Sequence, residues 1–265
     1  MSVFSIQDIF FSCTDVAEYS GEHFASEHGL ARIISGEMQV SEADRSYILS
    51  PGQTVLFSRN RLARFVKNPL GDGTFRMITV FFRQTFLAQY YAAHTVRRDA
   101  VRMKDVLCFP PTPLLDSFFT SLLPYEELNG ALPEELVGLK LTEAVTILRP
   151  LDPAVDGLLS DFSEPGKIDL ADFMEKNFAF NISLEKFAYL TGRSLATFKR
   201  DFRKTFQTPP QKWLLERRLR QAHFLITERK LKPSEACMEV GFENLSHFST
   251  TFKQQFGYNP SSLTR

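Results

Sequence analysis

The 265-residue chain has little cysteine, a single tryptophan and no long apolar run. Its three cysteines, Cys13, Cys108 and Cys237, lie far apart and form no Cys-x-x-Cys pair. This spacing argues against a disulfide framework or a zinc knuckle and favours a reducing compartment. No segment approaches the roughly 18 apolar residues of a membrane span, and residues 1–13 lack the order of a signal peptide. We therefore expect a cytoplasmic protein with no membrane partner.

Histidine is also scarce, and the five histidines are not arranged as a metal site. In the first hundred residues, His23 and His28 stand near Glu22, Glu27 and Glu37, but no His-x-His pair occurs. A transition-metal site needs clustered imidazole and carboxylate ligands. The chain also has no Gly-x-Ser-x-Gly motif and no phosphate loop. We expect no metal, no cofactor and no enzymatic activity.

The net charge of the chain is zero, but the charge is unevenly distributed. Residues 160–265 hold 17 Lys and Arg against 12 Asp and Glu, a net charge of +5. Residues 1–159 hold 14 against 19, a net charge of −5. An acidic half joined to a basic half indicates two domains with different partners and weakly favours nucleic acid as the partner of the second.

The first half of the chain is predicted to form a β domain followed by helices. Short runs rich in β-branched and aromatic residues are separated by turn signals such as Pro51-Gly52, which is typical of a sandwich or small barrel. We expect strands at residues 31–34, 38–41, 47–49, 55–58, 63–66 and 75–82. We expect helices at residues 85–94, 114–123, 134–148 and 153–162. The breaker run at 163–167 marks the boundary between a domain at 1–163 (barrel about 1–84, helices about 85–163) and a domain at 168–265.

The second half of the chain is predicted to be entirely helical. Ser183 and Ser194 are candidate N-caps, and Pro210 is suited to the first turn of a long helix. We expect helices at residues 168–178, 184–190, 195–206, 210–228, 233–240 and 245–256.

Two of these predicted helices, 195–206 and 245–256, share one apolar pattern at an offset of 50 residues. The pattern is i, i+3, i+7, i+11, which forms one stripe on a helix. The stripes are Leu195, Phe198, Phe202 and Phe206 in the first helix, and Leu245, Phe248, Phe252 and Phe256 in the second. We expect all eight residues to be core.

Each of these two helices follows a short helix and a turn glycine. The short helices carry Ala188 and Ala236, and the turns carry Gly192 and Gly241. This is the layout of a helix-turn-helix. One such unit is equally compatible with a plain helical hairpin, but two in register, joined by one long helix, favour binding to double-stranded DNA. Residues 211–228 give a helix of roughly 27 Å, so two recognition helices could lie about 34 Å apart, in successive major grooves.

The polar faces opposite the stripes supply the candidate DNA contacts. They are Ser194, Ala196, Thr197, Lys199, Arg200, Arg203 and Lys204 in the first unit, and Ser246, His247, Thr250 and Lys253 in the second, with Arg193 further round the first helix. Arginine can bond guanine in a bidentate manner. We therefore expect the first unit to contact bases and the second to fix the register through phosphates, although each residue is also compatible with a solvated face.

Residues 168–265 resemble the AraC/XylS family of bacterial transcriptional regulators. The resemblance lies in residues 183–188, 194–203, 236–242 and 252–260, above all in the Gly-Phe turn, the Phe-Lys pair and the Gly-x-x-Pro ending. It implies base contacts at Ala196, Lys199 and Arg200, with Ser246, His247 and Thr250 as their counterparts. Family members commonly carry a bulkier or polar residue in place of Ala196. The resemblance also implies RNA polymerase as a partner, and activation of transcription.

The first half resembles the cupin-like barrel with dimerisation helices found in many members of that family. This similarity rests on residues 35–40 and 49–57 and implies an α+β fold, a homodimer formed through the N-terminal domain, and a small-molecule or protein effector. An effector pocket inside the barrel is expected to involve Phe57, Phe65 and Phe81. Residues 112–115 and 139–144 are similar to regulators of type III secretion, which a protein partner controls.

Two alternatives remain open from the sequence. One is a metal-dependent cupin-type enzyme fused to a helical domain, which a stoichiometric transition metal would support. The other is a constitutive DNA-binding dimer without a ligand, in which helices 134–148 and 153–162 form only an interface. A ligand sensor should have a pocket inside the barrel, but a barrel filled with side chains is equally compatible with the sequence. Thermal shifts across a metabolite panel would separate a ligand sensor from a constitutive dimer.

Overall fold

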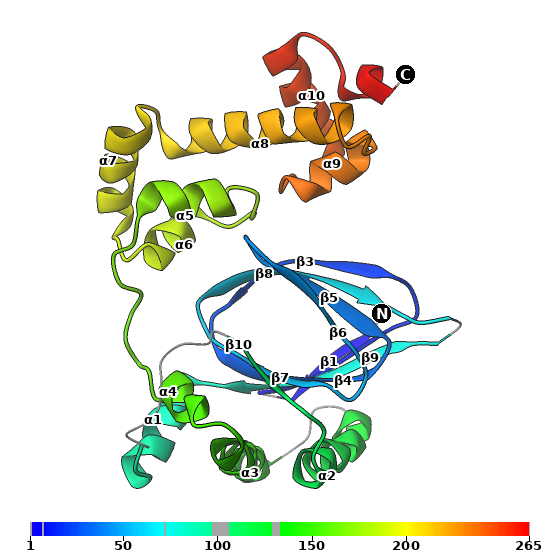
Figure 1. Cartoon of the computed structure of the whole chain (residues 1–265), viewed down its shortest axis with the longest axis vertical. Coiled ribbons are helices and arrows are strands. Elements are labelled where there is room, and N and C mark those ends of the chain that lie inside the picture. Colours follow the sequence, from blue (N-terminus) through cyan, green and yellow to red (C-terminus); the bar gives the residue numbers. More distant parts are fainter. Residues whose placement is uncertain (1, 7, 72, 97–105, 129–132, 265) are drawn as a thin grey trace. The chain divides into compact units, whose positions relative to one another are not determined.

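The computed structural model divides the chain into two compact units, Met1–Ser163 and Glu164–Arg265 (Figure 1). The structure describes residues 2–6, 8–71, 73–96, 106–128 and 133–264. Among them, no helix is long and apolar enough to cross a membrane. Residues 1–163 combine strands and helices and form an N-terminal sheet domain, whereas residues 164–265 consist of helices and form a C-terminal helical domain. The chain is therefore a two-domain α+β protein.

The strands of the N-terminal domain form two antiparallel sheets. The larger sheet has the order β1 (Ser2–Ile6), β2 (Ile9–Thr14), β9 (Phe75–Phe82), β4 (His28–Ser35), β7 (Thr54–Phe57) and β10 (Val106–Phe109). The smaller sheet has the order β3 (Glu18–Ala25), β8 (Arg61–Asn68), β5 (Glu37–Ser41) and β6 (Ser46–Leu49). All six predicted strands are confirmed, whereas β1, β2, β3 and β10 were not predicted.

The strands predicted to form a barrel lie in these two sheets, and no hydrogen-bonded pairing closes them into a barrel among the described strands. The chain crosses from the larger to the smaller sheet at Gly36, where the pairing of β4 with β9 becomes irregular between Ile33 and Ser35. Gly36 has φ +75°, and an added Cβ would lie 2.8 Å from the Asn68 carbonyl oxygen. Only glycine combines this backbone angle with so close an approach.

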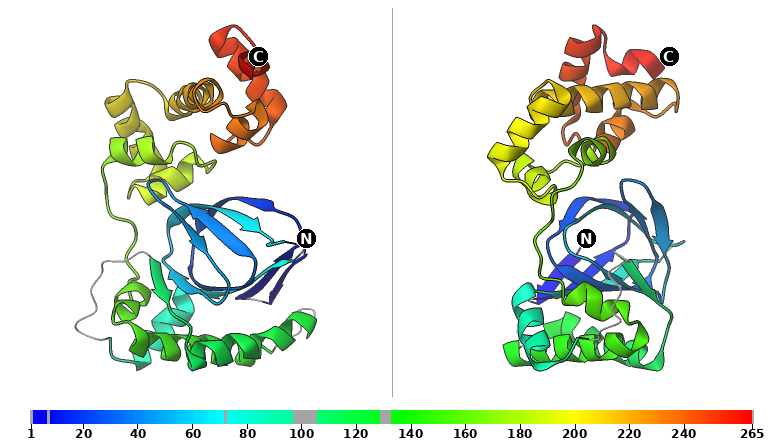
Figure 2. Two further views of the ribbon diagram at one scale, coloured as in Figure 1. Left: turned by 45° about the vertical axis from the view of Figure 1, so that its right-hand side comes forward. Right: turned by 60° about the vertical axis from the view of Figure 1, so that its left-hand side comes forward.

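Alternate residues of a strand point to opposite sides of a sheet, and β4, β7 and β9 of the larger sheet contribute buried residues to a core on each side. Ile33, Val55 and Phe75 belong to the core shared with the smaller sheet. Leu30, Leu56, Val80 and their neighbours belong to a second core with the helices. Those helices are α1 (Gln84–Ala93), α2 (Pro113–Leu122), the 3-10 turn η1 (Leu123–Leu128), α3 (Glu134–Leu151) and α4 (Ala154–Leu159). They gather along one side of the sheet, and Figure 2 shows the same arrangement from two further directions.

A buried ion pair connects three of these helices. Arg149 of α3 donates from Nε and Nη2 to the two carboxylate oxygens of Asp156 in α4, at 2.7 and 3.0 Å. The Tyr91 hydroxyl of α1 donates to the same carboxylate at 2.9 Å. Asp156 is almost fully buried, so its charge requires such partners.

The C-terminal domain consists of α5 (Leu170–Asn177), α6 (Leu184–Leu190), α7 (Leu195–Phe206), α8 (Pro210–Thr227), α9 (Pro233–Glu239), α10 (Leu245–Phe256) and the 3-10 turn η2 (Pro260–Thr264). The sequence predicts the limits of α6, α7 and α10 without error, and those of the other helices to within two residues. The long helix α8 separates two apolar cores. Leu214 near its start belongs to the core of α5, α6 and α7, and Leu219, Ala222 and Ile226 belong to the core of α9 and α10.

Candidate nucleic-acid interface

Helices α6 and α7 form the first helix-turn-helix. Both predicted N-caps are confirmed, because the hydroxyls of Ser183 and Ser194 accept from the backbone N–H groups of Lys186 and Thr197, each at 3.3 Å. Gly192 in the turn has φ +66°, and an added Cβ would lie within 2.6 Å of the backbone of Gly166 and Lys167. A larger residue would push the turn away from the backbone of Gly166 and Lys167, so this position requires glycine.

Helices α9 and α10 repeat the same construction. The Asn244 side chain caps α10 by accepting from the His247 N–H at 3.0 Å. Gly241 in the turn has φ +84°, and an added Cβ would lie 2.2 Å from the Ala179 carbonyl oxygen. Ala188 and Ala236 are buried, and such a small residue lets the two helices of each unit approach closely.

The apolar stripes are core at their centres and exposed at one end. Phe198, Phe202, Phe248 and Phe252 are completely buried, and Phe206 and Phe256 pack against them partly buried. The prediction that all eight stripe residues are core was wrong for Leu245, which is 47% exposed, and Leu195 is only half-buried. Both leucines occupy the first helical position of their helix.

The long helix α8 packs one aromatic ring against the end of each recognition helix. The Trp213 ring lies 4.6 Å from that of Phe206 in α7. The His223 ring lies 4.9 Å from that of Phe256 in α10, and its Nε2 is 2.8 Å from the Tyr258 hydroxyl. Figure 1 shows α7 and α10 at the two ends of α8. The two recognition helices are therefore each anchored to the same rod.

Apart from Arg193, the predicted contact residues lie on these two helices or their caps, on the side away from the core. In α7 and its cap, Thr197 is half-buried and the exposed residues are Ser194, Ala196, Lys199, Arg200, Arg203 and Lys204. In α10 the exposed residues are Ser246, His247, Thr250 and Lys253. The first surface carries four cationic side chains and the second only Lys253, so the difference in charge predicted from the sequence persists in the fold.

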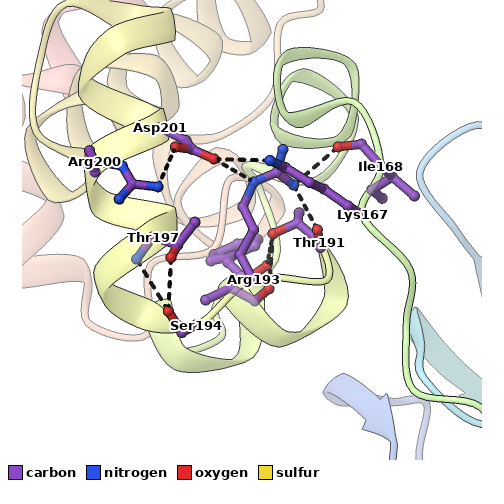
Figure 3. Close-up of polar contacts among 10 residues, drawn as sticks. Lys167, Ile168, Thr191, Arg193, Ser194, Thr197, Arg200 and Asp201 are labelled. Carbon is purple, nitrogen blue, oxygen red and sulfur yellow. Dashed lines mark hydrogen bonds and ion pairs between the residues drawn. The ribbon is translucent and has the colours of Figure 1, made fainter.

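Arg193 has a structural role that the sequence did not predict (Figure 3). Its side chain is only 7% exposed. Its guanidinium donates to the carbonyl oxygens of Thr191 and Ile168 at 2.6 and 3.0 Å, and to the Asp201 carboxylate at 3.3 Å. Because it points into the turn, it holds α7 against the segment before α5 and is not on the exposed face.

The Asp201 carboxylate lies close to three cationic side chains beside this turn, those of Lys167, Arg193 and Arg200. Desolvation acts to raise the pKa of its carboxyl group, but the hydrogen bond from Arg193 and the charges of Lys167 and Arg200 outweigh this effect and lower the pKa. Arg200 contributes little to the fold, because its side chain is 75% exposed and lies 3.5 Å from Asp201. It is therefore available to an outside partner.

The residues predicted for an effector pocket divide between two places. The rings of Phe57 and Phe81 lie 6.1 Å apart on strands that flank Gly29 of β4. The Phe57 ring fills the space that a side chain at Gly29 would need, with 2.1 Å to an added Cβ. Phe65 instead packs with the core between the two sheets. All three rings are half-buried.

His28, one of the histidines weighed as a metal ligand, is engaged within the fold. It is almost fully buried, and its Nδ1 accepts the backbone N–H of Arg59 at 3.3 Å. Burial and the charge of Arg59 lower the pKa of the imidazole to about 4. The side chain of His23 lies outside the described residues. Among the side chains that are described, no three His, Cys, Asp or Glu groups are placed to hold a metal.

Both halves of the chain match models of known protein families. A helix-turn-helix domain model matches residues 187–265, and the model of the ExsA N-terminal regulatory domain matches residues 28–148. The transcriptional regulator ExsA of Pseudomonas aeruginosa is 27% identical over 238 residues, covering 89% of this chain and 85% of that protein. The virulence regulon transcriptional activator VirF of Yersinia enterocolitica is 27% identical over 241 residues, covering 89% and 88%.

The chain is similar, over both of its halves, to AraC-type transcriptional regulators.

It is thus a DNA-binding regulator with an N-terminal regulatory domain. Among solved structures, an apo form of ToxT from Vibrio cholerae matches with a TM-score of 0.48 and 14% identity, covering 97% of each chain.

Two features of the chain could not be found from the sequence. Arg218 in α8 and Arg193 both bond backbone carbonyl groups of distant loops, and a backbone group leaves no signature in a sequence. The pairing of Trp213 and His223 with opposite recognition helices was missed because the two residues are 10 apart and unlike, so the 50-residue repeat does not relate them.

Proposed function

We propose that this regulator places α7 and α10 in successive major grooves on one face of duplex DNA. The observation that carries this proposal is the attachment of the two recognition helices to opposite ends of α8. The 18 residues of that helix span about 27 Å, and the helix widths at either end bring the recognition helices close to the roughly 34 Å of one DNA turn.

In this proposal the two units contribute unequally. Lys199, Arg200 and Arg203 contact bases and phosphates from the cationic surface of α7, with Ala196 against a base edge. Ser194, Thr197 and Lys204 contact the backbone beside them. The polar surface of α10, formed by Ser246, His247, Thr250 and Lys253, fixes the register of the protein on the duplex.

We infer that the regulator activates transcription through contact with RNA polymerase in the bacterial cytoplasm. The name of VirF, a transcriptional activator, supports this direction of control. We further infer that the protein has no enzymatic activity. Supporting this, the buried imidazole of His28 is occupied by a backbone N–H. A stoichiometric transition metal in the purified protein would instead favour a cupin-type enzyme.

The N-terminal domain is proposed to be a cupin-like module that forms a homodimer and responds to a small-molecule or protein effector. Two exposed leucines support dimerisation, Leu114 of α2 at 60% and Leu139 of α3 at 67%. Phe57 and Phe81 form the proposed effector contact, with Phe65 further inside. The second candidate, a constitutive dimer without a ligand, is favoured by the Phe57 ring that fills the space over Gly29.

The DNA-binding proposal is tested by selecting duplexes from a random pool with the full-length protein. The selected duplexes should share two conserved blocks whose centres lie about 10 base pairs apart. Binding should weaken steeply with salt, because several phosphate contacts release counterions. A pool that yields no shared sequence, or an affinity that is insensitive to salt, would overturn the proposal.

A further inference from the structure

The two helix-turn-helix units do not share an apolar core, so something else must fix their relative orientation. Leu214 near the start of α8 packs with the first unit, and Leu219 onward packs with the second. Between them, one polar residue of α8 contacts both units. This residue is Arg218, which is half-buried at the middle of the helix.

The guanidinium of Arg218 donates to three backbone carbonyl groups. Its Nε and Nη2 donate to Phe178 and Phe180, each at 2.8 Å, in the loop that joins α5 to α6 of the first unit. Its Nη1 donates to Gly241 at 3.3 Å, in the turn of the second unit. Arginine suits this position because its planar fork holds several donors in fixed directions and stays charged.

Two further contacts join the same loop to the same turn. The carbonyl of Ala179 approaches Gly241 so closely that an added Cβ would lie 2.2 Å from its oxygen. The Asn181 amide donates to the Glu243 carboxylate at 2.7 Å. The second turn therefore rests directly on the first unit, with Arg218 beneath the junction.

We propose that Arg218 is a positioning residue that fixes the angle between the two recognition helices, and so sets the spacing of DNA half-sites that the protein accepts. This inference rests on the proposed engagement of two grooves. The three donors of Arg218 named above point inward to carbonyl groups, so it acts on DNA through the orientation of α7 and α10. Without it, only α8 and the remaining junction contacts hold the units, and a smaller fraction of molecules has both helices in the binding arrangement.

Arg217 provides a matched control. It lies next to Arg218 on α8, but its ion pair and ring contact stay within the first unit, with Nε 3.0 Å from the Glu175 carboxylate and the guanidinium 4.4 Å from the Phe178 ring. Arg217→Met and Arg218→Met each remove one positive charge from the same helix. A difference between them therefore reports the junction rather than net charge.

The test uses the full-length protein and a duplex of about 40 base pairs selected from a random pool, long enough for two successive grooves. Variants of this duplex carry one base pair added or removed between the half-sites, which shifts one site by about a tenth of a turn. Wild type and Arg217→Met should discriminate sharply against these variants. Arg218→Met should bind the selected duplex about tenfold more weakly, if about a tenth of the molecules remain oriented, and should lose most of the discrimination. Arg218→Lys should be intermediate.

Each result has one meaning. If Arg218→Met keeps the spacing preference of wild type, or loses affinity by the same factor on every spacing, the positioning role is overturned. If Arg218→Met does not fold, Asn181→Ala removes another contact across the same junction and should relax the preference, while an unchanged preference would overturn the role. A wild-type protein with no spacing preference at all would overturn the proposed two-groove engagement instead.

Discussion

Substitution of Arg200 by alanine should separate DNA recognition from folding. The side chain is 75% exposed and its ion-pair partner, Asp201, is 3.5 Å away. Asp201 also keeps Arg193 and Lys167 as partners. An exposed pair of this kind contributes about 0–1 kcal/mol, so the melting temperature should change little.

The effect of Arg200→Ala on DNA binding should be much larger. Loss of an arginine that bonds a guanine edge costs about 1–3 kcal/mol and relaxes one base position, which corresponds to a rise in Kd of roughly 5- to 150-fold. The assay is a fluorescence anisotropy titration of a selected duplex at fixed salt. It is followed by a new selection with the variant protein.

Arg220→Ala is the control for charge. Arg220 is an exposed residue of α8 that lies 4.0 Å from the Glu216 carboxylate. Its loss should weaken binding slightly and equally for all sequences, because it removes only long-range attraction. If Arg200→Ala leaves the preferred sequence unchanged and behaves like Arg220→Ala, the assignment of Arg200 to a base is refuted.

The remaining predictions concern the N-terminal domain. His28 stays neutral in the fold, where its pKa is lowered to about 4, whereas in the unfolded chain the imidazole binds a proton near pH 6.5. The stabilising effect of the neutral imidazole is therefore present above pH 6.5 and is lost as the pH falls. Between pH 7 and pH 5 this loss is about 2 kcal/mol, so urea unfolding of wild type should depend more steeply on pH than that of His28→Asn, which keeps an acceptor for the Arg59 N–H; equal slopes would refute this. Leu139→Lys should shift the protein from dimer to monomer in sedimentation, whereas Ile48→Lys, at another exposed position, should not; a dimer that survives Leu139→Lys would exclude that surface.

The helices were predicted well because their limits are determined by local chemistry. Ser183 and Ser194 cap the helices that follow them, and Gly257 ends α10 in the left-handed conformation. The strands were harder, because their partners are distant in the chain. The run Ile9–Thr14 pairs with β9, and Val106–Phe109 pairs with β7; neither short run contains the signal that defines its partner.

The exposed face of α7 could be predicted because a stripe of buried phenylalanines determines which residues point outward. Tertiary contacts are not determined in this way. Arg193 was expected further round the polar face of α7, but it turns inward to the carbonyl groups of Thr191 and Ile168. Leu245 was expected in the core, but it stands at the exposed first turn of α10. For Arg193 the deciding neighbour, Ile168, belongs to a different part of the chain.

The most direct test of the account is a hydroxyl-radical footprint of the full-length protein on a selected duplex. Two protected windows are expected on one face of the DNA, with centres about one helical turn apart. Lys253→Ala in α10 should weaken the window that Arg200→Ala in α7 leaves largely intact. A single protected window, or two windows that both variants weaken equally, would contradict the engagement of successive grooves by two separate recognition helices.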